Sequence, residues 1–114
     1  MIDDIVYVDV NEGSKRVMNN VKLYVKLITK FKDDQNILQI EAALSAGEME
    51  KAQNITHTLK GLTANLSLSE LYKQCLELES QLKAGSFNPD HLERVKNAYS
   101  LTITEIDKVV AQYA

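Results

Sequence analysis

His57 is the residue whose type and neighbours most suggest chemistry. A neutral imidazole nitrogen is a competent nucleophile near neutral pH, so a histidine can carry a transferable group such as a phosphoryl. Lys60 follows three residues later, where a helix places its ammonium beside the ring and within reach of an anion held there. Gly61 comes next, although a glycine inside a helix costs about 1 kcal/mol relative to alanine. These residues predict an accessible nucleophile assisted by a cation.

The helical pattern around His57 predicts that its side chain faces outward. The apolar residues of a helix expected over residues 48–66 form one stripe, and His57 lies about 180° from the centre of that stripe at about 100° per residue. Gly61 and Ala64 lie on the same outer face, where long polar side chains are usual. We interpret their small size as room for close approach by another molecule. The expected partner-binding residues are Gln53, Asn54, Gly61 and Ala64.

The rest of the chain predicts an all-α fold that positions this face. Apolar residues recur at helical spacing, and only four Gly and one Pro interrupt them. Short connections make consecutive helices antiparallel neighbours, so we expect an up-down four-helix bundle with an additional N-terminal helix packed across or beside it. Residues 1–13 are expected to be an extended or short helical lead-in that covers one end of the core. The helices are expected over residues 14–31, 34–46, 48–66, 68–84 and 89–113.

Several helix ends carry recognisable capping residues. Ser followed three residues later by Glu matches a capping box, in which each side chain bonds a backbone N–H at the helix start. A glycine after a helix favours a left-handed C-terminal turn, and Asn before Pro favours a helix start. The expected capping boxes are Ser45 with Glu48 and Ser67 with Glu70, and the expected end and start are Gly85 and Asn88-Pro89.

Composition limits the classes of function. The 114 residues suffice for one domain, which we expect to span residues 1–114, and 45% of them are hydrophobic. A net charge of −3 does not suggest a nucleic-acid binder, and no apolar run approaches the roughly 20 residues of a membrane span. The lone Cys75 cannot form an internal disulfide and lies at a core position. We expect a monomeric, cytoplasmic protein without a membrane partner.

The remaining titratable residues have less distinctive surroundings. His91, at a helix start, is expected to be solvated, and Glu70, Glu77 and Glu79 are expected to form a solvated acidic face. Glu79 has a second interpretation: if the helices on either side of Ser67 pair, it comes level with His57 and orients the imidazole. Two His and one Cys at these spacings do not supply a metal site. No Gly-rich phosphate loop is present, so no ATP and no cofactor are expected.

The sequence around His57 resembles that of a known family. His57-Thr58-Leu59-Lys60-Gly61 is similar to the His-x-x-Lys-Gly signature of bacterial histidine-phosphotransfer (HPt) domains. The resemblance covers roughly residues 11–85. It includes Tyr24-Val25-Lys26-Leu27-Ile28 with Phe31, the turn Ala46-Gly47-Glu48, and the continuation Ala64-Asn65-Leu66 with Leu71, Cys75, Leu78 and Glu79.

This resemblance implies a function in a two-component phosphorelay. HPt domains are helical bundles that carry a phosphoryl group on the Nε2 atom of the motif histidine, which is His57 here. The family's Lys and Gly correspond to Lys60, expected to stabilise the phosphoryl group, and Gly61. The implied partners are receiver domains, both of a hybrid sensor histidine kinase and of response regulators. The family commonly has a small residue after the Gly, where this chain has Leu62, and we expect altered packing there.

Two other functions fit parts of the pattern. The phosphorylated first domain of a chemotaxis-type kinase has a similar bundle and motif, but would continue into a kinase core beyond Ala114. A non-catalytic bundle that only binds a receiver domain would need no phosphotransfer at His57. Incubation with a phosphorylated receiver domain separates these interpretations, because a carrier acquires the phosphoryl group and an adaptor only binds.

Overall fold

The computed structural model describes residues 5–113, and the regular elements in that part of the chain are all helices. This agrees with the predicted all-α class. Four helices fall within two residues of the expected bounds at each end. In chain order the elements are α1 (Val10–Arg16), α2 (Val21–Phe31), α3 (Asn36–Ser45), α4 (Met49–Asn65), α5 (Ser69–Ala84) and α6 (Pro89–Tyr113).

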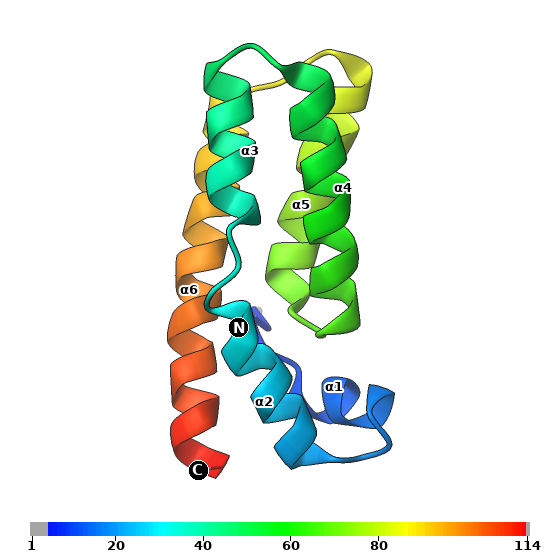
Figure 1. Cartoon of the computed structure of the whole chain (residues 1–114), viewed down its shortest axis with the longest axis vertical. Helices are drawn as coiled ribbons and strands as arrows, with labels where there is room; N and C mark the ends of the chain where they lie inside the picture. Colours follow the sequence, from blue (N-terminus) through cyan, green and yellow to red (C-terminus); the bar gives the residue numbers. More distant parts are fainter. Residues whose placement is uncertain (1–4, 114) are drawn as a thin grey trace.

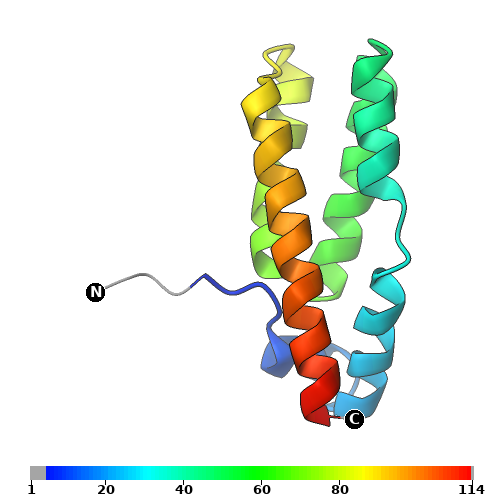
Figure 2. The same cartoon turned by 90° about the vertical axis from the view of Figure 1, so that its left-hand side faces the viewer.

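Helices α3, α4, α5 and α6 form the up-down four-helix bundle expected from the sequence (Figure 1). The 25 residues of α6 make it the longest helix, and it extends past the other three. Helix α2 packs beside this extension, below α3 in Figure 1, and α1 lies across the same end of the molecule. Figure 2 shows α6 running the full height of the molecule, with α3 and α2 successively beside it. Among the described residues, no helix is long and apolar enough to cross a membrane.

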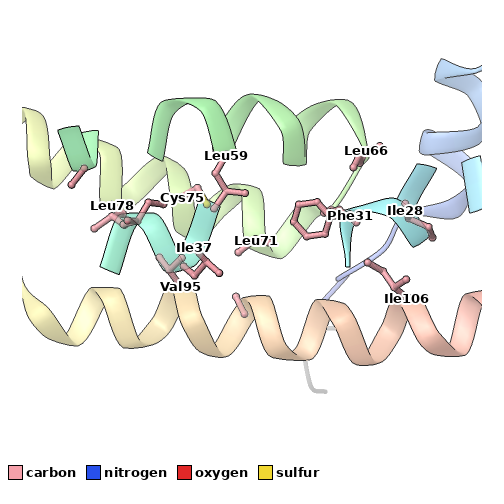
Figure 3. Close-up of a cluster of buried hydrophobic side chains, with 14 of the residues drawn as sticks. Ile28, Phe31, Ile37, Leu59, Leu66, Leu71, Cys75, Leu78, Val95 and Ile106 are labelled. Carbon is pink, nitrogen blue, oxygen red and sulfur yellow. The ribbon is translucent and has the colours of Figure 1, made fainter. Parts of the chain in front are cut away.

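One continuous core joins these helices. Figure 3 shows buried side chains of α2, α3, α4, α5 and α6 converging, with Leu59 and Cys75 among those at the centre. Cys75 is fully buried, as its core position predicted. Burial raises the pKa of the Cys75 thiol to about 12, so it stays protonated and unreactive. The core therefore runs from the end of the bundle where α5 connects to α6, down to the level of α2.

The helix expected over residues 14–31 is in fact two helices. Met18 and Asn19 both adopt left-handed backbone angles, with φ of 59°, which ends α1. Asn20 then caps α2, because its side chain accepts a hydrogen bond from the Leu23 N–H at 3.0 Å. Asparagine tolerates the left-handed region better than most residues. The two successive left-handed residues, Met18 and Asn19, break the helix. The apolar residues of this stretch keep helical spacing across the turn, so the sequence pattern predicted one continuous helix.

The described part of the lead-in covers one end of the core, as expected, whereas residues 1–4 lie outside the described residues. Gly13 of α1 packs directly against the ring of Tyr24, so closely that a Cβ would lie 2.1 Å from a ring carbon. The Tyr24 hydroxyl donates a hydrogen bond to the Leu66 carbonyl at 2.6 Å. The Asp9 N–H donates to the Ser67 carbonyl at 3.0 Å. The N-terminal segment is therefore tied to the turn between α4 and α5.

The two expected capping boxes were wrong. Ser45 is the last residue of α3, and the N-cap of α4 is Glu48, which makes no side-chain cap bond. Ser67 lies one residue before the N-cap of α5, and its hydroxyl donates to Glu12 of α1 at 2.9 Å. The other two ends were correct. Gly85 has a φ of 69°, and the Asn88 side chain accepts from the Asp90 N–H at 2.9 Å.

The prediction that His91 is solvated was also wrong. His91 is 2% exposed, and its Nε2 lies 3.1 Å from the Gln74 carbonyl oxygen of α5. The buried stripe of α6 runs through residues 91, 95, 98, 102, 106 and 109, so the first turn of the helix already packs on α5. Thr102 lies in this stripe because its hydroxyl bonds the Ala98 carbonyl of its own helix at 2.7 Å.

Candidate functional site

His57 lies near the middle of α4, on a face set by a core stripe slightly different from the expected one. The buried residues of α4 are Ala52, Thr56, Leu59 and Thr63. At about 100° per residue, this stripe puts His57 roughly 130° from the core direction rather than 180°. His57 is therefore exposed but inclined toward α5. The apolar pattern missed the rotation because threonine reads as polar, whereas the Thr56 hydroxyl bonds the Ala52 carbonyl at 2.7 Å.

The inclination toward α5 brings His57 against Glu79. His57 Nδ1 lies 2.7 Å from Glu79 Oε2, and the histidine side chain is 69% exposed while that of Glu79 is 4% exposed. This confirms the pairing of the two helices that would bring Glu79 level with His57. The other interpretation, a solvated acidic face, was wrong for Glu79. Glu70 is half-buried and accepts from the Gln74 side chain at 2.8 Å, while the Glu77 side chain is 62% exposed.

Lys60 binds the same carboxylate from one turn further along α4. Its Nζ lies 2.6 Å from Glu79 Oε1, and its side chain is 20% exposed. Burial by itself would raise the pKa of the Glu79 carboxyl, but hydrogen bonds from Lys60 and His57 outweigh it, and the pKa lies below its usual value. The bond to Glu79 raises the pKa of the Lys60 ammonium. Both groups are therefore charged at neutral pH.

This arrangement determines which nitrogen of the His57 ring is free. A deprotonated carboxylate can only accept hydrogen bonds, so Nδ1, which faces Glu79, must carry the proton. In the neutral ring, Nε2 then has the available lone pair. A fixed tautomer, an exposed ring and a neighbouring ammonium together make a nucleophile that can attack an electrophilic group on a partner.

The expected partner-binding residues surround His57 on the outer surface of α4. Asn54 and Gly61 are exposed, and Gln53 and Ala64 are half-buried. A Cβ built at Gly61 would have nothing within 4 Å, so no neighbouring helix requires glycine there. Ala64 lines an open hollow of about 350 Å³ together with Arg16 of α1 and Tyr72 of α5, among others. Two turns of α4 beyond His57, the surface around Ala64 is therefore built by three helices.

Two further residues bear on the site. Lys83 of α5 was missed by the sequence interpretation, and its Nζ lies 4.0 Å from Glu79 Oε1. Its spacing of four residues from Glu79 was the available signal, because residues four apart share a helix face. Leu62 is half-buried at the edge of the core, where the helical pattern put it. Among residues 5–113, no three His, Cys, Asp or Glu side chains come close enough to hold a metal ion.

Comparison with known proteins gives one match. The family model described as Hpt domain matches residues 27–108, which is more than half of the chain and includes His57, Lys60, Gly61 and Glu79. The matched region begins and ends later than the resemblance seen over residues 11–85. No curated protein and no solved structure matches the chain.

Proposed function

Since the chain belongs to the Hpt domain family, we propose that His57 is the residue that carries a phosphoryl group through a two-component phosphorelay. Members of this family are phosphocarrier modules that act with receiver domains. The observation that carries the proposal is the bond of 2.7 Å between His57 Nδ1 and the buried Glu79 carboxylate. In the neutral ring it leaves the lone pair on Nε2, on the exposed side chain, which is the state that phosphoryl acceptance needs.

The proposed transfer begins with a phosphorylated aspartate of a receiver domain. The Nε2 lone pair of His57 forms a bond to phosphorus while the bond between phosphorus and the aspartyl oxygen breaks. The electron pair of the broken bond leaves with the aspartate as a carboxylate. Nδ1 keeps its proton, so the ring gains positive charge, and the Glu79 carboxylate stabilises that charge as it orients the ring. The reverse sequence, with a carboxylate of a second receiver as nucleophile, discharges the carrier.

Lys60 and Gly61 have separate proposed roles in this reaction. Lys60 lies on the turn of α4 after His57, where its ammonium can stabilise the phosphoryl oxygens while remaining bonded to Glu79. Gly61 leaves open space next to the ring, so a receiver domain can bring its aspartate into contact with Nε2. Gln53, Asn54 and Ala64 are proposed to contact that receiver.

The proposed partners follow from this chemistry. The phosphoryl donor is a receiver domain, proposed to belong to a hybrid sensor histidine kinase, and the acceptor is a response regulator. We propose that the protein is cytoplasmic, because its proposed partners act in the cytoplasm and because Cys75 is a free thiol. We also propose that it acts as a monomer. The chain is proposed to be charged and discharged only by such partners.

A relay experiment tests this function. A receiver domain carrying labelled phosphoryl is mixed with the protein, the receiver is removed, and a second receiver domain is added. We expect the label to appear on the protein and then on the second receiver, drawn from a panel of receivers of the same organism. Binding without transfer of label to the protein would identify an adaptor and contradict the proposal.

A further inference from the structure

Lys83 places a second ammonium beside the proposed phosphoryl site. It lies one turn after Glu79 on α5, with its Nζ 4.0 Å from Glu79 Oε1 and its side chain 58% exposed. The same oxygen accepts a hydrogen bond from Lys60, and the other carboxylate oxygen faces His57 Nδ1. One buried carboxylate therefore collects basic side chains from both helices.

The charges at this point do not balance once the histidine is phosphorylated. A phosphoryl group brings a charge of about −1.5 to −2 at neutral pH. In the unphosphorylated protein, the positive charge of Lys60 is already matched by Glu79 through their bond of 2.6 Å. Adding the phosphoryl group leaves Lys60 and the protonated ring to offset both Glu79 and the new dianion. Another cation near Nε2 would reduce this excess of negative charge.

Lys83 is the side chain placed to supply that cation. The turns of α4 on either side of His57 carry Gln53 and Gly61, which are uncharged. The facing turns of α5 carry Leu76 and Ser80, both exposed, and then Lys83. At 4.0 Å from the carboxylate, Lys83 is beyond hydrogen-bond distance. Its ammonium can therefore turn toward a phosphoryl group without breaking a bond made in the unphosphorylated protein.

We propose that Lys83 is a second phosphoryl-binding residue, so that the group on His57 Nε2 lies between an ammonium from α4 and one from α5. This inference rests on the proposed function of His57. The two lysines then differ in when their ammonium groups bind at the site. Lys60, 20% exposed and bonded to Glu79, is present at the site before phosphorylation, whereas the exposed Lys83 is recruited by the phosphoryl charge. The consequence is a phosphohistidine held longer than Lys60 alone would hold it.

Loading with phosphoramidate tests Lys83 without any partner protein. The bond from phosphorus to the nitrogen of phosphoramidate breaks as the bond to His57 Nε2 forms, and ammonia leaves with the electron pair. The parent, Lys83→Gln and Lys83→Arg are loaded, and the phosphohistidine signal is followed by ³¹P NMR. Lys73→Gln is the matched control, because Lys73 is an exposed lysine of α5 that makes no ion pair among the described residues.

We expect Lys83→Gln to lose its phosphohistidine about two- to fivefold faster than the parent, as suits an exposed charge pair. Lys83→Arg should restore most of the lifetime, and Lys73→Gln should match the parent. The difference between Lys83→Gln and the parent should shrink as ionic strength rises, because salt screens exposed charges. A merely structural role would show no such salt dependence.

The outcomes separate this inference from the function on which it rests. Equal lifetimes of Lys83→Gln and the parent at low ionic strength would overturn the role of Lys83, while a parent that loads His57 and passes the phosphoryl group to a receiver would uphold the proposed function. A parent that does not load on His57 would overturn both. Since Lys83 is exposed, its replacement should leave the helix content measured by circular dichroism unchanged.

Discussion

In the proposed transfer, the position of a single proton on the His57 ring determines which nitrogen can attack the phosphoryl group. Glu79 fixes that proton on Nδ1 through a contact of 2.7 Å and, being deprotonated, it can also balance the charge that the ring gains. Glu79 is 3% exposed, so its carboxylate is held by the fold rather than by solvent. The reactivity that we propose for an exposed histidine thus depends on a buried partner from the next helix.

Replacing Glu79 with Gln tests this dependence. The amide oxygen can still accept from Nδ1, so the ring tautomer should survive, but the carboxylate charge is lost. We expect slower acceptance of the phosphoryl group, and unfolding free energy at pH 7 lowered by about 1–2 kcal/mol because Lys60 loses its charged partner. Phosphoryl transfer rates and urea unfolding measure the two effects. A variant with parental values for both would show that the Glu79 charge is unimportant.

The stability effect of Glu79 should also depend on pH in a defined direction. Since the folded state lowers the pKa of this carboxyl below its usual value of 4.5, its contribution is fully present above that value. The contribution is lost as the pH falls through the lower pKa of the folded state. The unfolding free energies of the parent and Glu79→Gln should therefore converge as the pH is lowered from 7 toward 3. A gap that stays constant over this range would contradict the ion-pair account.

At the residue scale, the sequence motif pointed to candidate site residues whose roles are proposals, and the sequence pattern failed where burial decided the environment. His57, Lys60 and Gly61 were selected from their spacing, and the structure places His57 and Gly61 on the exposed face of α4 and Lys60 on its flank against Glu79 of α5. His91 was taken as solvated, although it is 2% exposed, because the sequence around a helix start does not show which neighbour covers it. Lys83 was overlooked, since its importance depends on the packing of α5 against α4.

At the level of helices, α4 carries a cost in helix propensity at Gly61 that packing does not explain. A Cβ at this position would have nothing within 4 Å, so packing does not require glycine. Gly61→Ala should therefore stabilise the protein by up to about 1 kcal/mol through helix propensity. Gly61→Gln should keep most of that gain and slow phosphotransfer, because a long side chain would stand where the receiver approaches. A lower melting temperature for Gly61→Gln, or undiminished transfer, would count against the proposal that Gly61 leaves room for the receiver domain.

Gly13 of α1 should respond in the opposite way. A Cβ there would lie 2.1 Å from a ring carbon of Tyr24, and Tyr24 is held in place by its hydrogen bond to the Leu66 carbonyl. Gly13→Ala must therefore displace α1, and we expect a loss of about 1–3 kcal/mol, as for overpacked cores. Urea unfolding measures this loss. Parental stability in Gly13→Ala would mean that α1 does not pack firmly on α2.

The helices themselves were largely predictable, and their joints were not. Apolar spacing located α3, α4, α5 and α6 because each buries one stripe. It missed the break between α1 and α2, where Met18 and Asn19 take left-handed angles that a hydrophobic pattern does not encode. The capping boxes failed because serine also bonds partners distant in sequence, as Ser67 does with Glu12.

For the molecule as a whole, the family match over residues 27–108 covers α3, α4, α5 and most of α6, and it leaves α1, the start of α2 and the end of α6 outside. The N-terminal residues outside the match nevertheless pack on the turn between α4 and α5, and Arg16 shares a hollow with Ala64. We therefore retain residues 1–114 as one proposed domain. The fold class followed from composition and spacing, whereas the contribution of α1 to the hollow beside Ala64 required the three-dimensional structure.

Phosphorylation of the parent and of His57→Gln by the same labelled receiver domain measures whether His57 is the residue that carries the phosphoryl group. Because His57 is exposed, the variant should keep the parental circular dichroism spectrum. We expect the parent to acquire an acid-labile, base-stable label on a histidine and His57→Gln to acquire none. Label on His57→Gln, or an acid-stable label on the parent, would contradict the assignment of His57 as the phosphoryl carrier.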